Sequence, residues 1–112
     1  MRKYSVMDSL MALADPTRRQ IVEMLGRGER ASGEIAENFA ISAPAVSQHL
    51  RVLRDARLVQ VRVEAQRRIY TLNAAGLAEI DAWLAQVRRF WAGRLDALEH
   101  ELRKPEKKRR KK

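Results

Sequence analysis

The segment at residues 41–59, ISAPAVSQHLRVLRDARLV, constrains the fold most tightly because it encodes a short helix with two contrasting faces. Ser42 is a favourable N-cap residue, and Pro44 is tolerated in the first turn, where its missing N–H costs little. Three apolar residues recur at helical spacing and should face a core: Val46, Leu50 and Leu53. The other side carries hydrogen-bonding side chains: Ser47, Gln48, His49 and Arg51. Such a helix over residues 42–54 fits the major groove of DNA, although an ordinary surface helix has a similar pattern.

Three shorter helices are expected before this segment. The first spans residues 5–14, with apolar side chains along one side. Asp15 and Pro16 then provide an N-cap and a first-turn proline for a second helix that ends at Leu25. Ser32 is expected to cap a brief third helix, with only about three residues between that helix and Ser42. Two short helices joined by so tight a turn predict a helix-turn-helix motif.

After Arg57 the hydrophobic period changes from helical to alternating, which predicts two strands. Val59, Val61 and Val63 alternate with polar residues, residues 64–66 are expected to turn, and a second strand follows through Leu72. A hairpin that directly follows a recognition helix is a wing. Its tip should present long donors suited to phosphates or to the minor groove: Gln66, Arg67 and Arg68.

A long helix is expected from Ala74 to about Arg103, with apolar residues recurring every seven positions. Its outer part extends beyond any core that so short a chain can build, so we expect a homodimer interface. The alternative is that Trp83 and Trp91 fill the interior of the monomer. The predicted interface comprises Leu10, Leu84, Val87, Trp91, Leu95, Leu98 and Leu102.

The formal net charge of +9 is concentrated in two places. Residues 103–112 carry eight basic side chains against one acidic side chain, and residues 42–72 carry six arginines against two acidic side chains. Basic charge confined to the segment with the predicted recognition helix and wing favours a phosphate-facing surface. Residues 104–112 are expected to form a disordered basic tail outside a domain of residues 1–103. That tail either adds DNA affinity through counterion release or only aids solubility.

Several functional classes are disfavoured by what the sequence lacks. It contains no cysteine, no apolar run of the ~20 residues needed to span a membrane, and no glycine-rich phosphate loop. His49 and His100 both fall in segments with other assignments, which leaves no nucleophile and base pair for catalysis. We therefore expect a cytoplasmic, nucleoid-associated protein that is not an enzyme and uses no cofactor.

The order of elements resembles that of ArsR-type winged helix-turn-helix repressors. The matching residues are ALADPTRRQIVEML at 12–25, GEIAENFAISAPAVSQHLRVLRDARLV at 33–59, VRVEAQRRIYTLN at 61–73 and FWAGRLDALEHEL at 90–102. The resemblance implies a symmetric dimer that binds an operator and represses transcription. The chain departs from metal-sensing members, since residues 28–36 lack cysteine and the last helix offers only His100 between two glutamates. A tetrahedral zinc site needs about four ligands, so no metal site is expected.

The sequence thus predicts a mainly α fold with a small β-hairpin, a winged helix-turn-helix with a long C-terminal dimerisation helix. Its partner is expected to be double-stranded operator DNA, held by a dimeric repressor that regulates its own gene in one version of this hypothesis. The alternative is a dimeric protein-interaction or non-specific DNA-binding module that uses the basic face and tail. Base reading is assigned to Ser47, Gln48, His49 and Arg51. Phosphate and wing contacts are assigned to Ser32, Ser42, Ala43, Pro44, Gln66, Arg67 and Arg68.

Overall fold

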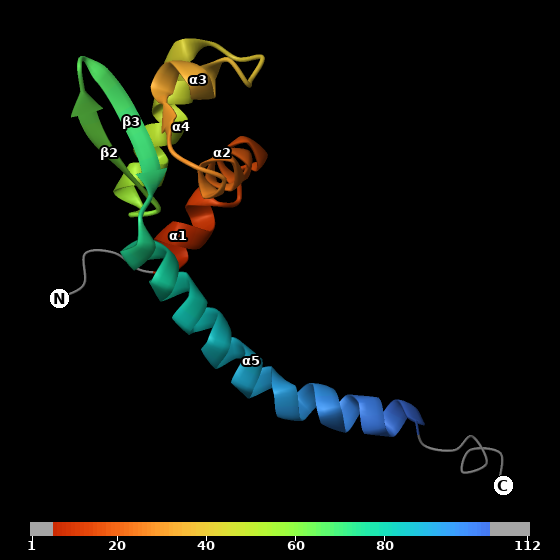
Figure 1. Ribbon diagram of the computed structural model, residues 1–112. Helices are drawn as coiled ribbons and strands as arrows, with labels where there is room; N and C mark the ends of the chain where they lie inside the picture. Colours follow the sequence, from red (N-terminus) through yellow and green to blue (C-terminus); the bar gives the residue numbers. More distant parts are fainter. Residues whose placement is uncertain (1–5, 104–112) are drawn as a thin grey trace, which may run out of the picture. The chain divides into compact units, whose positions relative to one another are not determined.

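The computed structural model describes residues 6–103, which form helices and one small antiparallel sheet (Figure 1). The described residues group into two units, one ending at Ile80 and one beginning at Asp81. The basic tail expected at residues 104–112 lies outside the described residues. In chain order the elements are α1 (Val6–Ala12), α2 (Pro16–Gly26), β1 (Arg30–Ala31), α3 (Ser32–Ala36), α4 (Ala43–Asp55), β2 (Val59–Glu64), β3 (Arg67–Leu72) and α5 (Ala74–Arg103). The predicted fold class, mainly α with a hairpin and a long last helix, is confirmed.

Helix α2 begins and ends for local reasons that the sequence announces. The Asp15 carboxylate accepts a hydrogen bond from the backbone N–H of Arg18 at 3.0 Å, and Pro16 occupies the first helical position. After the helix, Gly28 takes a φ of 147°, a conformation that a side chain would disfavour. Both predicted ends of this helix are therefore confirmed to within one residue.

The region around α3 differs from the sequence prediction in two ways. The N-cap is Ala31 and not Ser32, because Ala31 is already held extended in β1, where it pairs with Ile69. The Glu34 carboxylate accepts the backbone N–H of Ala31 at 2.8 Å and so replaces the expected hydroxyl cap. The helix ends at Ala36, which leaves residues 37–42 as a connection twice as long as the predicted three residues. Helix α1 is also shorter than the predicted span of residues 5–14, and residue 5 lies outside the described part.

Helix α4 ends in a Schellman motif, which satisfies carbonyl groups that the last turn leaves without helical partners. The N–H of Leu58 donates to the carbonyl of Leu53 at 3.0 Å, and the N–H of Arg57 donates to that of Arg54 at 2.9 Å. Arg57 occupies the left-handed position with a φ of 64°. The motif turns the chain directly from the helix into β2.

The sheet has the strand order β1-β3-β2, with antiparallel pairing throughout. Val61 lies opposite Tyr70, and Glu64 lies opposite Arg67 on either side of a two-residue turn. Ala65 and Gln66 both have positive φ, 51° and 69°, as in the type I′ turns that match the twist of a hairpin. The hairpin prediction is confirmed, whereas β1 was not predicted because two residues carry no detectable alternation.

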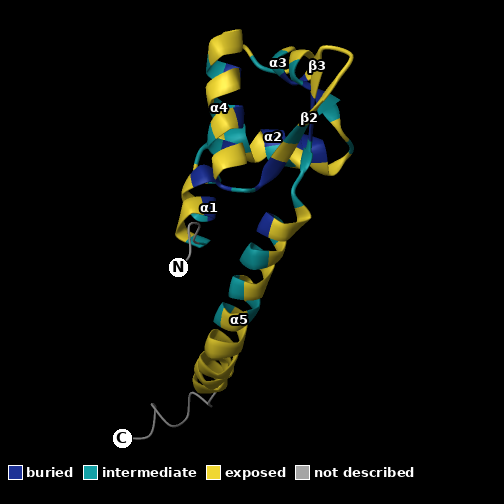
Figure 2. Ribbon diagram, turned by 90° about the vertical axis from the view of Figure 1, so that its left-hand side faces the viewer, coloured by how far each residue is buried: buried dark blue, intermediate teal, exposed yellow. Residues whose placement is uncertain are grey.

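One hydrophobic core holds the first unit together. The apolar stripe predicted for α4 is confirmed, since Val46, Leu50 and Leu53 are all buried. They pack in a cluster with residues of α2, α3, β2 and β3, so the opposite side of α4 faces outward. Figure 2 shows this division of α4 into a buried and an exposed side. The fully buried members of the core, at under 2 % exposure, are Ile21, Ile35, Leu50, Leu53, Leu58 and Val59.

Candidate nucleic-acid interface

The start of α4 is fixed by a cap that also exposes backbone donors. The hydroxyl oxygen of Ser42 accepts the backbone N–H of Ala45 at 3.2 Å, as the sequence predicts. Ser42, Ala43 and Pro44 are all exposed. The first turn of α4 thus presents free N–H groups and the positive end of its helix dipole to the surface.

The outward face of α4 carries three of the four predicted base-reading residues. Ser47, Gln48 and Arg51 are exposed, because they lie at i, i+1 and i+4 on the side opposite the buried stripe. None of these three side chains is held by another part of the first unit as described. They are therefore available to an external partner.

His49, the fourth predicted base reader, is directed toward α2 instead. Its Nδ1 lies 3.2 Å from Nη1 of Arg18 and 3.9 Å from the Asp15 carboxylate, and its side chain is only 20 % exposed. Arg18 offers donors only, so the imidazole nitrogen accepts in this contact. Arg18 is itself anchored, because its Nε donates to the carbonyl of Ala12 at 2.6 Å. His49 thus ties the recognition helix to the junction of α1 and α2.

The wing places its predicted residues together with the start of α3. Gln66, Arg67 and Arg68 are exposed and line a surface pocket of about 380 Å³ that Ser32 also lines. Glu34 and Glu37 are on the same pocket wall. The structure thus brings Ser32 to the wing, and Ser42–Pro44 are not among the residues that line this pocket.

A second pocket, of about 290 Å³, lies between α4 and β3. Its lining residues are Ser47, Arg51, Arg54, Arg68 and Tyr70. Arg54 and Tyr70 were missed from the sequence. Arg54 had a usable signal, since it follows Ser47 by seven and Arg51 by three residues and so shares their helix face. Tyr70 had none, because its place beside α4 depends on strand pairing.

Not every arginine of residues 42–72 is free to bind a phosphate. Arg62 donates to both carboxylate oxygens of Glu29, at 2.9 and 3.1 Å, and Arg57 lies 3.3 Å from Glu79. The hydrogen bond from Arg62 lowers the pKa of Glu29 and in turn raises that of Arg62. Within residues 6–103, four arginines of this segment have no such carboxylate partner: Arg51, Arg54, Arg67 and Arg68.

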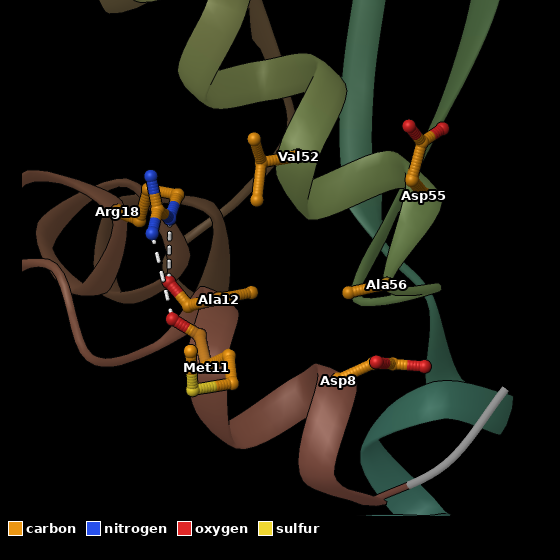
Figure 3. Close-up of a pocket in the computed structure, with 7 residues that line it drawn as sticks. All are labelled: Asp8, Met11, Ala12, Arg18, Val52, Asp55 and Ala56. Atoms are coloured by element: carbon orange, nitrogen blue, oxygen red, sulfur yellow. Dashed lines mark hydrogen bonds between the residues drawn. The ribbon is translucent and has the colours of Figure 1, made fainter.

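A third pocket, of about 420 Å³, lies among α1, α2 and the end of α4 (Figure 3). Met11, Val52 and Ala56 give it an apolar wall, while Asp8 and Asp55 lie at the end away from Arg18. Met7 and Met11 are 62 % and 63 % exposed on one face of α1. The sequence prediction had assigned only Leu10 of this helix to an interface, and Leu10 is half-buried.

The second unit presents a continuous apolar stripe along α5. Within residues 81–103 no side chain is buried, and Leu84, Trp91 and Leu98 are 41 %, 47 % and 56 % exposed. The idea that Trp91 fills the interior is thus not supported. Phe90 packs edge to face on Trp91, with ring centroids 5.3 Å apart, and the Arg94 guanidinium lies 4.8 Å from the Phe90 centroid. Leu95 and Leu102 are also exposed, and Val87 is half-exposed.

Metal and membrane features were also searched for within residues 6–103. No cluster of three or more His, Cys, Asp or Glu side chains suited to a metal ion was found in that part of the chain. No helix in it has the length and apolar character needed to span a membrane.

A capped recognition helix that follows a short helix and precedes an arginine-bearing wing defines a winged helix-turn-helix DNA-binding regulator. The family model described as bacterial regulatory protein, arsR family, matches residues 15–61. The chain is 52 % identical over 80 residues to the HTH-type transcriptional regulator Rv2034 of Mycobacterium tuberculosis, which covers 71 % of this chain and 72 % of that protein. The chain therefore belongs to the ArsR family of transcriptional regulators.

Two further comparisons agree with this assignment. The transcriptional repressor SdpR of Bacillus subtilis is 38 % identical over 73 residues, which are 65 % of this chain and 81 % of SdpR. A crystal structure of an ArsR family transcriptional regulator aligns with a TM-score of 0.73 at 28 % identity, covering 82 % of this chain and 97 % of that one. The resemblance inferred from the sequence motifs is thus confirmed.

Proposed function

We propose that this regulator is a homodimeric repressor that binds a palindromic operator and blocks transcription. The observation that carries the proposal is the outward face of α4, where exposed Ser47, Gln48 and Arg51 stand among arginines that lack carboxylate partners. Repression is favoured by the similarity to a protein named as a repressor. In the simplest version the operator lies before the gene of the regulator itself, and the protein resides with the nucleoid in the cytoplasm.

Base reading is assigned to the exposed part of α4. Gln48 has the amide geometry that pairs bidentately with adenine, and Ser47 accepts or donates to either kind of base pair. Arg51 reaches a guanine edge or a phosphate. His49 was predicted to read bases too, but its contacts with Arg18 favour a role in orienting α4.

Backbone contacts are assigned to the two helix starts and the wing. The exposed first turn of α4 at Ser42, Ala43 and Pro44 offers N–H groups and a favourable dipole to a phosphate. Ser32, Gln66, Arg67 and Arg68 share one pocket, so they are placed to hold the flanking backbone or minor groove together.

The dimer is assigned to the apolar stripe of α5. The stripe carries Leu84, Trp91, Leu95, Leu98 and Leu102, whose exposure in a single chain leaves them unburied unless a second surface covers them. Val87 and, on α1, Leu10 extend the predicted interface, and the exposed Met7 and Met11 are added to it. A two-fold dimer presents two recognition helices to successive major grooves about 34 Å apart.

The decisive experiment selects bound duplexes from a random pool and measures affinity for the selected site across a salt series. A specific repressor should recover an inverted repeat and keep its preference as salt rises. Binding driven by the basic tail should lose affinity without preference, and deletion of residues 104–112 should then abolish it. Recovery of no preferred sequence by the full chain would contradict the repressor and favour the interaction or non-specific module.

A further inference from the structure

The pocket between α4 and β3 combines features that a surface groove seldom shares. Three arginines from two elements line it, Arg51 and Arg54 from the helix and Arg68 from the wing. None of the three has a carboxylate partner within residues 6–103, although Arg57 and Arg62 of the same segment do. Like charges gathered without a counter-ion repel one another, so the arrangement is stabilised when an anion enters.

Tyr70 supplies a second and independent indication of a ligand. It is only 7 % exposed and its ring packs in the core, yet it also lines the pocket. Its hydroxyl has no hydrogen-bond partner within the described residues and is not among fully buried atoms, so it reaches the surface at the pocket. Tyrosine hydroxyls near the core usually find a partner. Here a ligand oxygen is the natural partner.

The chemistry of the lining selects one class of ligand. Guanidinium groups present planar forks of N–H donors that match the oxygens of a phosphate, and the hydroxyls of Ser47 and Tyr70 add further donors. A volume of about 290 Å³ admits a phosphate group with several waters. A carboxylate is lacking from the lining, so nothing there favours a cation.

We propose that this pocket is a phosphate clamp, in which Arg51, Arg54 and Arg68 bind one phosphodiester of the DNA backbone where α4 and the wing meet. The inference rests on the proposed function and deepens it. It assigns Arg54 and Tyr70 to the interface and gives Arg51 a backbone contact. Because one phosphate bridges α4 and β3, the clamp sets how deeply the recognition helix enters the groove.

Arg54→Ala and Tyr70→Phe in the full-length protein test the clamp, with Arg27→Ala as the matched control. Arg27 is an exposed arginine just after α2, so its removal changes the net charge equally outside the pocket. Against the selected operator, Arg54→Ala should bind about tenfold more weakly and show a salt slope shallower by about 0.9. Tyr70→Phe should weaken binding without changing that slope, because it removes a hydroxyl and no charge.

Two arms identify the source of the phosphate. In the first, single phosphates of the operator are replaced by neutral methylphosphonates. One position in each half-site should weaken the wild type and leave Arg54→Ala unaffected. In the second, inorganic phosphate competes with DNA against chloride at equal ionic strength, and competition seen for the wild type but not for Arg54→Ala extends the clamp to free phosphate.

The inference and the proposed function fail in different ways. If the wild type selects no operator, the proposed function is wrong. If the wild type binds a selected operator while Arg54→Ala behaves as Arg27→Ala does in affinity, salt slope and both arms, the phosphate clamp is overturned and the repressor stands.

Discussion

A Cβ atom on Gly76 would lie 1.7 Å from the carbonyl oxygen of Arg57, which means that only glycine permits this approach of two backbones. Gly76 is in the first turn of α5 and is buried, whereas Arg57 occupies the left-handed position that ends α4. The contact joins the end of the recognition helix to the start of α5 within the first unit. It is thus a structural relationship with a direct bearing on stability.

Gly76→Ala should destabilise the protein by about 1–3 kcal/mol or more, because the added methyl group meets backbone that cannot move aside as a side chain would. The matched control is Gly93→Ala in the same helix, where nothing lies within 4 Å of the added atom. That control should be neutral or stabilising by up to about 1 kcal/mol through helix propensity. Urea denaturation measures both variants, and equal stability of the two would contradict the close packing.

Gln48→Ala and His49→Ala should separate base reading from helix positioning. Gln48→Ala should cost about 1–3 kcal/mol of operator binding and relax the preference at one base pair of each half-site. His49→Ala removes the contact with Arg18, so it should alter the affinity for all sequences alike and leave base preference intact. Selection from randomised half-sites reads both variants. A changed base preference in His49→Ala would restore the residue to the base-reading set.

Arg67→Ala tests the wing. The residue is exposed, lies opposite Glu64 beside the hairpin turn and has no ion pair among the described residues. Its loss should weaken binding to specific and non-specific duplexes by a similar factor and lower the salt slope by about 1. Filter binding at several salt concentrations gives the slope. Unchanged affinity with unchanged slope would remove Arg67 from the interface.

Asp15 predicts a pH dependence of stability. The backbone N–H of Arg18 that donates to the Asp15 carboxylate lowers its pKa below the ordinary value of 3.8. The carboxylate cap therefore stabilises the fold above that value, and the stabilisation is lost as the pH falls through the lower folded-state pKa. Asp15→Asn keeps a capping oxygen that does not titrate. Its free energy of unfolding should fall less than that of the wild type between about pH 5 and pH 2, and parallel curves would rule out the cap as a contributor.

Leu98→Glu tests the dimer through a charge placed on the apolar stripe of α5. It should shift the protein to monomer in analytical ultracentrifugation and weaken operator binding, since one half-site alone is then held. Ala97→Glu is the matched control, because Ala97 lies away from the stripe on the neighbouring helix face. If both variants remain dimeric, the stripe is not the interface.

Local sequence chemistry predicted much of the first unit. The Asp15-Pro16 and Ser42-to-Pro44 starts, the stripe of Val46 and Leu50 and the alternation after Arg57 were all correct, because capping, helical spacing and strand spacing act over few residues. The start of α3 was predicted wrongly. Ser32 is a good cap in isolation, but pairing of β1 with β3 made Ala31 the cap through a contact distant in sequence.

The sequence by itself determined which helix has a recognition face, where the wing turns and which stripe of α5 is apolar, because these follow from the order and spacing of residues. Only the tertiary structure decided which of those side chains are free. It drew His49 to Arg18, paired Arg62 with Glu29, and left Arg51, Arg54 and Arg68 around one pocket with Tyr70. The physical reason is that ion pairs and pockets join residues distant in the chain, whose distances are set only when the core of the first unit packs.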